Sequence, residues 1–153
     1  MTSTHSSSGG APSPTEVLII GAGKRVQRAA VPAFHRASDL YAIRHLVGRQ
    51  EREESFDGRS YPVRALKDMK PGDLKGVGLI FVCVAKESIP GVLRDLAALD
   101  PADASLLIDT PVLRFKHLRH AKHLRAFKSA SVAEDCSTLP WLDAARASIA
   151  AGD

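Results

Sequence analysis

The fold of this chain is indicated by residues 17–26, VLIIGAGKRV, in which a short β-branched run meets a Gly-Ala-Gly turn. The run predicts a strand over Val17–Ile20, and the residues after the turn favour a helix. Gly21 permits a tight turn, and Gly23 lets backbone N–H groups approach a pyrophosphate at the positive end of that helix. Val26 stands where the dinucleotide fingerprint has its third glycine, and a side chain there pushes the helix away from the strand. An ordinary strand-to-helix turn therefore stays the alternative to a nucleotide site.

The rest of the chain alternates apolar runs with helical stretches, which is typical of βαβ units. Val77–Val84 is the strongest predicted strand because it is apolar on both faces, as a central parallel strand is. Further strands are expected at Tyr41–Val47, Tyr61–Val63, Ser105–Ile108 and Ser131–Ala133. Helices are expected at residues 24–37, 64–69, 89–99, 113–128 and 139–151, whereas the polar segment Glu51–Ser60 predicts a loop or a short irregular helix. The pattern predicts an α/β fold: a single Rossmann-like domain over residues 17–153, with a doubly wound parallel sheet of strand order 3-2-1-4-5-6.

Composition sets limits on the class of protein. The chain has 153 residues, of which 44% are hydrophobic and 25% charged, an ordinary globular composition. Residues 1–16 are rich in Ser, Thr, Gly and Pro and lack the regions of a secretory signal, so we expect a disordered tail or a vector-derived segment. No apolar stretch approaches the ~20 residues of a membrane-spanning helix. Two cysteines make no disulfide framework, which favours a cytoplasmic location.

The end of the second predicted strand determines which adenosine ribose would fit. An NAD site has Asp or Glu there to accept a hydrogen bond from the 2′-hydroxyl, whereas this chain has Val47-Gly48-Arg49-Gln50. Arg49 can bind a 2′-phosphate with two parallel hydrogen bonds, and Lys24 and Arg25 add positive charge beside the phosphates. These residues favour NADP over NAD, with a solvent-facing arginine and a solvated helix start as the ordinary alternatives.

Four segments resemble, in order and spacing, the N-terminal half of the Gfo/Idh/MocA oxidoreductases. They are VLIIGAGKRVQRAAVPAF at 17–34, GLIFVCVAKESIPGVLRDLAAL at 78–99, LLIDTPVL at 106–113 and LPWLDAARASIAAGD at 139–153. The resemblance implies a dinucleotide-binding domain that takes part in hydride transfer on a sugar- or polyol-like substrate. The candidate cofactor-binding residues are therefore Gly21, Ala22, Gly23, Lys24, Arg25 and Arg49 and, from the resemblance, Ala85, Lys86 and Asp109.

The chain departs from this family where the family has its chemistry. Members carry Thr-Pro-Asn-x-x-His after the fourth strand, where this chain has Val84-Ala85-Lys86 and then Ile89. The family's Glu-Lys-Pro becomes Asp109-Thr110-Pro111, and a threonine has no charge with which to polarise a carbonyl. The family's substrate domain has no counterpart in these residues. Two hypotheses follow: a cofactor domain that needs a separate substrate domain or partner chain, or a non-catalytic nucleotide-binding or protein-interaction module. We expect no catalytic residue in the chain and no turnover by it alone.

A basic segment supplies a rival class of function. Residues 111–128 contain six Lys or Arg and no acid, so the net charge of +4 is concentrated in one predicted helix. The cations could bind nucleic acid or an acidic partner, but a helix that buries its apolar side against the sheet is the simpler interpretation, and nucleic acid is not expected. His117, His120 and His123 recur every third residue. On an α-helix only neighbouring pairs share a face, and the flanking cations repel a metal ion, so no metal site is expected.

Overall fold

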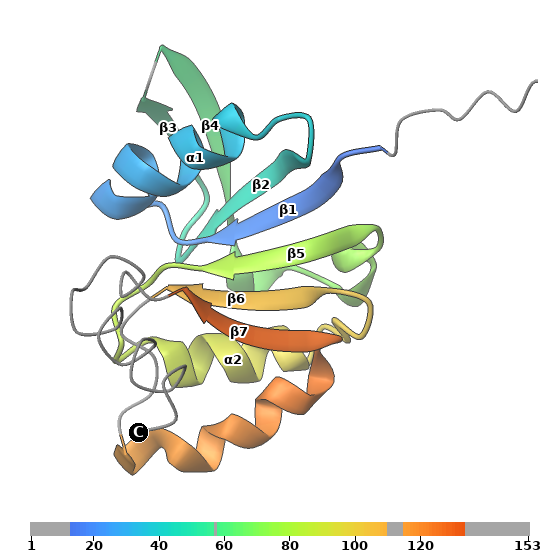
Figure 1. Ribbon diagram of the computed structural model, residues 1–153. Helices are drawn as coiled ribbons and strands as arrows, with labels where there is room; N and C mark the ends of the chain where they lie inside the picture. Colours follow the sequence, from blue (N-terminus) through green and yellow to red (C-terminus); the bar gives the residue numbers. More distant parts are fainter. Residues whose placement is uncertain (1–12, 57, 110–114, 134–153) are drawn as a thin grey trace, which may run out of the picture.

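The apolar run at residues 17–20 ends a central strand, β1 (Thr15–Ile20), and is buried on both faces of a sheet. The structure is a computed structural model that describes residues 13–56, 58–109 and 115–133. Within these residues the sheet has seven strands in the order β3-β4-β2-β1-β5-β6-β7, and every neighbouring pair is parallel except β3 and β4 (Figure 1). The other strands are β2 (Tyr41–Gly48), β3 (Arg52–Phe56), β4 (Arg59–Ala65), β5 (Val77–Val82), β6 (Ser105–Asp109) and β7 (Ser129–Ala133).

The predicted α/β fold and strand order are confirmed. The prediction does not include β3, so its third strand is β4 and its fourth to sixth strands are β5 to β7. With this correspondence the observed order β4-β2-β1-β5-β6-β7 is the predicted order 3-2-1-4-5-6. The order reverses between β1 and β5, because the chain first adds strands on one side of β1 and then crosses to the other. This reversal places the carboxyl ends of β1 and β5 side by side, and a crevice forms there in open α/β sheets.

Helices cover both faces of the sheet (Figure 1). One face carries η1 (Val26–Ala30) and α1 (Val31–Arg36), and the other carries α2 (Ile89–Ala97), with η4 (Phe115–Ala126) packed against α2. Successive residues of β1 alternate between the two cores: Leu18 joins the α2 side and Ile19 the α1 side. Two short 3₁₀ turns, η2 (Leu66–Asp68) and η3 (Pro71–Leu74), connect β4 to β5.

The helix after the glycine turn is irregular at its centre. The sequence predicts one helix over residues 24–37, and the structure has π-helical geometry over Val26–Ala30, followed by α-helix to Arg36. Pro32 explains the change, because a proline has no N–H for the carbonyl four residues before it and its ring collides with that carbonyl. The wider turn, closed by a hydrogen bond from Val31 N–H to Val26 O, accommodates the proline without ending the helix.

The prediction of a loop or irregular helix at Glu51–Ser60 is wrong. Arg52–Phe56 forms the edge strand β3, which pairs with β4 in an antiparallel hairpin. Phe56 stacks on Tyr61 of β4, with ring centroids 4.4 Å apart. The segment is polar because it lies at the sheet edge, where charged side chains discourage pairing with another chain, and polarity alone does not distinguish such a strand from a loop.

The structure of the basic segment also differs from the prediction. The sequence predicts an α-helix over residues 113–128 that buries its apolar side against the sheet. Its described part is a 3₁₀ helix over Phe115–Ala126 that packs on α2. Phe127 is 7% exposed and belongs to the core, whereas Leu118 is 53% exposed. The predicted burial thus holds at one end of the apolar side and fails at the other.

The remaining predicted elements are shifted by small amounts. The strand predicted at Val77–Val84 ends at Val82, and the helix predicted at 89–99 ends at Ala97. The brief third strand predicted at Tyr61–Val63 extends over Arg59–Ala65. The tail at 1–16 falls largely outside the described residues, as does the helix predicted at 139–151. No helix in the described part of the chain is long and apolar enough to cross a membrane.

Candidate functional site

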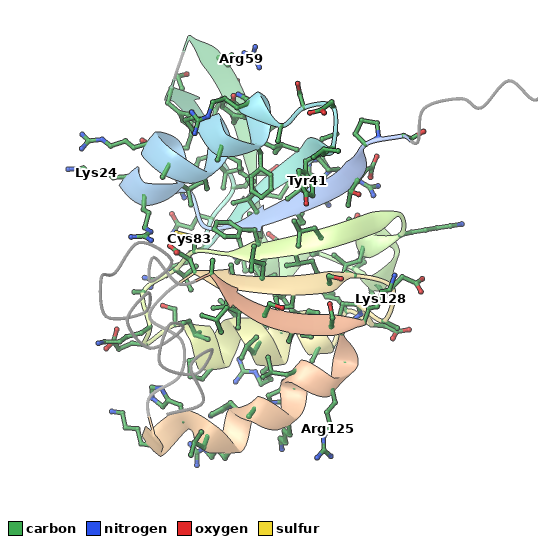
Figure 2. The ribbon with its side chains drawn as sticks, viewed as in Figure 1. Lys24, Tyr41, Arg59, Cys83, Arg125 and Lys128 are labelled. Carbon is green, nitrogen blue, oxygen red and sulfur yellow. The ribbon has the colours of Figure 1, made fainter. Side chains whose placement is uncertain are left out.

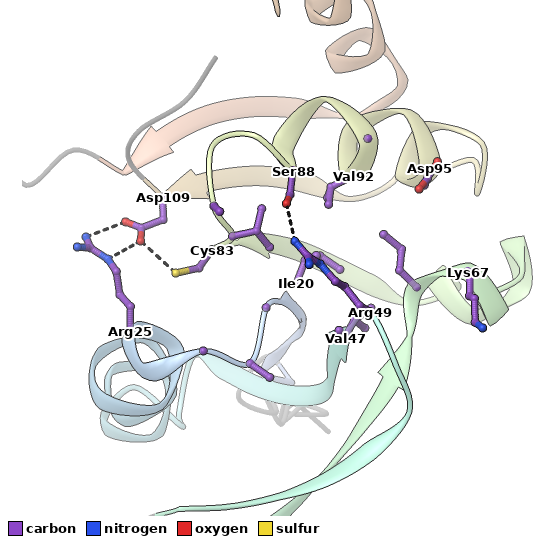
Figure 3. Close-up of a pocket in the computed structure, with 18 of the residues that line it drawn as sticks. Ile20, Arg25, Val47, Arg49, Lys67, Cys83, Ser88, Val92, Asp95 and Asp109 are labelled. Atoms are coloured by element: carbon purple, nitrogen blue, oxygen red, sulfur yellow. Dashed lines mark hydrogen bonds and ion pairs between the residues drawn. The ribbon is translucent and has the colours of Figure 1, made fainter. Parts of the chain in front are cut away.

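A cavity lies in the crevice at the strand-order reversal (Figure 3). Its volume is about 760 Å³, and it is lined from the carboxyl ends of β1 and β2, from the segment after β5, from α2 and from the end of β6. Ligands of open α/β sheets bind outside the carboxyl ends of the strands at this topological position. Cofactor sites commonly have volumes of ~300–1,000 Å³, so the crevice is large enough for an extended nucleotide.

The glycine turn forms the floor of the crevice, and its two glycines are needed for different reasons. Gly21 has φ +125°, and a Cβ atom there would lie 2.2 Å from the carbonyl oxygen of Cys83. The protein itself therefore requires glycine at this position. A Cβ on Gly23 would meet no atom of the described residues within 4 Å, because Gly23 faces the open crevice. No contact with this part of the chain requires glycine there, so the space it leaves is available to a ligand.

Val26, at the position of the missing third glycine, is fully buried between β1 and the helix. Its Cγ2 lies 3.4 Å from the point a Cβ on Gly21 would occupy. The valine thus fills the contact between helix and strand. The side chain of Val26 does not close the crevice, whose volume is about 760 Å³.

One end of the crevice is strongly basic. Arg49, just after β2, reaches across the crevice and donates from Nη2 to the hydroxyl of Ser88, 3.1 Å away (Figure 3). Arg52 at the start of β3 and Lys67 of η2 line the same end. Arg52 is paired with Glu54 at 2.6 Å, whereas the partner of Arg49 is a neutral hydroxyl. Exchanging that hydroxyl for a phosphate would give Arg49 a charged partner.

The other end holds a buried carboxylate, Asp109, at the end of β6. Arg25 binds it with two nitrogens, Nη2 to Oδ1 at 2.9 Å and Nε to Oδ2 at 2.5 Å. The thiol of Cys83 donates to Oδ2 at 3.1 Å. Burial first, and then the hydrogen bond and charge of Asp109, raise the pKa of Cys83 to about 12. The thiol is therefore protonated at neutral pH and is a poor nucleophile.

Most of the predicted cofactor-binding residues meet in this crevice. Its lining includes eight of them: Gly21, Ala22, Gly23, Lys24, Arg25, Arg49, Ala85 and Asp109. The ninth, Lys86, lies in the turn after Ala85 and does not line the crevice.

Sequence reasoning missed Arg52, Lys67 and Ser88, which also line the crevice. Arg52 fell in the segment mistaken for a loop, and Lys67 comes from a short turn with no motif. Ser88 could have been found, because a serine one residue before a helix that starts Ile89-Pro90 is a standard N-terminal signal.

The described lining contains lysine, arginine, aspartate and cysteine but no histidine. Among the described residues, no three His, Cys, Asp or Glu side chains converge in a way that could hold a metal ion. Within this part of the chain the crevice is thus suited to binding anionic groups.

No family model and no curated protein sequence matches this chain. Among solved structures, the Rex-family repressor RSP is similar at 10% identity and TM-score 0.63, over 90% of this chain and 61% of that one. RSP in complex with beta-NADH matches at 12% identity and TM-score 0.61, over 90% and 62%. An oxidoreductase from Thermotoga maritima matches at 13% identity and TM-score 0.65, over 91% and 44%.

At these identities the similarity shows the fold alone. The chain is a Rossmann-like α/β domain, and it spans less than two thirds of each of these three proteins.

Proposed function

We propose that this chain binds a nicotinamide dinucleotide in the crevice, with NADP preferred to NAD. The single observation that carries the proposal is the Gly21–Gly23 turn, which opens into a cavity of about 760 Å³ at the strand-order reversal. Backbone N–H groups at this turn and the start of the helix would hold the pyrophosphate. The complex of the structurally similar repressor RSP with beta-NADH supports the same class of ligand.

The preference for NADP rests on the basic end of the crevice. Arg49 after β2, Arg52 of β3 and Lys67 of η2 line this end, and Asp95 lines the crevice from α2. Arg49 occupies the position after β2 where an NAD site has its acid, so a ribose 2′-hydroxyl has no carboxylate to donate to at that position, whereas a 2′-phosphate gains cations. Arg49 is the best placed of the three, because its guanidinium already lies across the crevice and its present partner is neutral.

The chain's own contribution is binding rather than chemistry. The carboxylate of Asp109 is occupied by Arg25 and Cys83, and the Cys83 thiol has a pKa of about 12. The nicotinamide would supply the hydride chemistry, and a substrate domain or partner chain would supply the proton-transferring groups. Membership of the Gfo/Idh/MocA family would make the substrate a sugar or polyol. The alternative is that the chain binds the nucleotide without catalysing a reaction, and the same residues would then hold the nucleotide.

Calorimetric titration of NADP and NAD against the wild type and Arg49→Ala tests the proposal. A charge-assisted contact contributes about 1.5–3 kcal/mol, so the wild type should favour NADP by about ten- to a hundredfold. Arg49→Ala should lose this preference while binding NAD unchanged. Arg28→Ala is the matched control, since Arg28 is exposed and does not line the crevice. Equal affinity of the wild type for the two cofactors, or an unchanged preference in Arg49→Ala, would contradict the role of Arg49. Absence of binding would contradict the proposed function itself.

A further inference from the structure

The basic segment has a three-residue repeat that its 3₁₀ geometry turns into straight rows. Residues 116–127 are KHL-RHA-KHL-RAF, four triplets that each begin with a cation and end with an apolar residue. The described segment Phe115–Ala126 is a 3₁₀ helix, and Phe127 continues its spacing with a hydrogen bond from its N–H to Leu124 O at 3.3 Å. Such a helix has three residues per turn, so residues three apart lie directly above one another.

The four cations that begin the triplets form one row, which we call the cation row: Lys116, Arg119, Lys122 and Arg125. All four are exposed, and Arg125 points away from the body of the protein (Figure 2). A rise of ~2.0 Å per residue separates neighbouring cations by about 6 Å, so the row is about 18 Å long. On an α-helix each step of three residues would turn the next cation by about 60°, and the four would spread over half the circumference.

The apolar ends of the triplets form a row on another side of the helix, and the last two of them fix the helix to the protein. Phe127 is buried in the core and Leu124 packs against it, beside α2. The backbone N–H of Lys128 donates to Ala104 O at 3.0 Å, which ties the end of the segment to the loop before β6. The cation row is therefore presented on a supported surface.

A third row, His117, His120 and His123, lies beside the cation row and is half-buried. The rings of His120 and His123 are 5.9 Å apart and tilted by 30°, and Arg119 Nε lies 3.3 Å from Nε2 of His120. Burial, followed by the charges of Arg119 and the neighbouring histidines, lowers the pKa of His120. Its ring is therefore neutral at pH 7 and offers a flat aromatic face rather than another charge.

We propose that the cation row binds the phosphate backbone of a single-stranded nucleic acid, with the neighbouring histidine rings as places for bases to stack. Four cations that repeat about every 6 Å along a straight row suit a regular polymer of charge, because each can contact a phosphate of the same strand. Cationic tracks lined by aromatic rings are the usual means of binding single strands without sequence preference. The sequence alone disfavoured nucleic acid, because a helix that packs its apolar side against the sheet is the simpler interpretation of the cations, and the 3₁₀ geometry adds their alignment.

Two other acidic partners fit less well. An anionic membrane is bound by helices that insert an apolar face, but here Phe127 and Leu124 pack on the core and, over residues 116–127, Leu118 is the one large apolar side chain that is exposed. A protein interface has an apolar centre with charges at its rim, whereas this surface presents its charges as a continuous row.

Fluorescence anisotropy with a labelled oligothymidine of about 15 nucleotides tests the proposal, a length near the upper site size of single-strand binding folds. Four phosphate contacts predict a slope of about −3 for the logarithm of the binding constant against that of the salt concentration. Affinity should then fall about 50-fold between 50 and 200 mM salt. The test variant replaces the cation row with glutamine at all four positions. The matched control replaces Arg28, Arg36, Arg59 and Lys75, which are exposed on other elements, and removes the same charge.

We expect the test variant to lose at least tenfold in affinity at low salt and nearly all of the salt dependence, and the control to keep most of both. Far-UV circular dichroism and NADP titration show whether the variant is folded with an intact crevice. If it is not folded, Arg119→Gln alone should reduce the magnitude of the slope by about 0.7. Absence of binding by the wild type, equal losses in the two variants, or tighter binding to polyglutamate or to phosphatidylserine vesicles would each overturn the proposal. None of these outcomes bears on cofactor binding, which is measured separately.

Discussion

Replacement of Gly21 by alanine should destabilise the whole domain, while the same replacement at Gly23 should affect only the ligand. At Gly21 the new Cβ would lie 2.2 Å from Cys83 O, on a backbone with φ +125°. A non-glycine residue in this region of φ costs about 1–3 kcal/mol. The overlap is with backbone, so the turn must also move, which weakens the hydrogen bonds from Gly21 N–H to Val47 O (2.7 Å) and from Cys83 N–H to Ile20 O (2.8 Å).

Each of those hydrogen bonds contributes about 0.5–1.5 kcal/mol, so we expect a total loss of about 2–4 kcal/mol for Gly21→Ala. For a domain of this size that lowers the melting temperature by about 5–15 °C. Gly23→Ala adds a methyl group to open space and should change stability by less than about 0.5 kcal/mol. It should nevertheless weaken NADP binding, because the methyl group occupies the path of the pyrophosphate.

Differential scanning calorimetry of the two variants beside the wild type measures the first effect, and titration of Gly23→Ala with NADP measures the second. The reasoning is refuted if Gly21→Ala melts no lower than Gly23→Ala. It is refuted equally if Gly23→Ala binds NADP as the wild type does, since the open space at that position would then have no connection with a ligand.

Three further predictions concern the core, the acid response and the thiol. Phe127→Ala should destabilise the domain by about 3–5 kcal/mol in urea unfolding, and Leu118→Ala, at a side chain that is 53% exposed, should have little effect; similar losses would contradict the arrangement of η4. Hydrogen bonds from the Lys70 N–H and the Arg64 guanidinium lower the pKa of Asp73 below 3.8, so its stabilising effect is present above that pH and is lost as the pH falls through the lowered value. The urea midpoints of the wild type and Asp73→Asn should therefore differ at pH 6 and converge toward pH 2, and a constant difference would disprove the linkage. With the other cysteine replaced by serine, Cys83 should react slowly with iodoacetamide at pH 8, and Asp109→Asn should accelerate the reaction; rapid alkylation of the parent would show that the thiol is not held protonated.

The sequence by itself determined the fold class, the strand order and the position of the crevice. Val17–Ile20 and the core of Val77–Val84 are apolar on both faces, and only a sheet covered by helices on each side can bury them. The glycine turn after the first of these strands places the crevice at the point where the order reverses. These features depend on local patterns, which is why they can be recognised in the sequence.

Only the tertiary structure decided which side chains meet in the crevice and what the polar segments become. Arg52 lines the crevice because its edge strand pairs with β4, and the pairing of Arg25 with Asp109 joins residues 84 positions apart. The triplets of residues 116–127 are compatible with an α-helix or with a 3₁₀ helix. The structure has the 3₁₀ helix, which aligns the cations, and in it Phe127 and Leu124 pack on the core beside α2. In each case the outcome depends on long-range packing, whose free energy outweighs the weak local preferences of a polar segment.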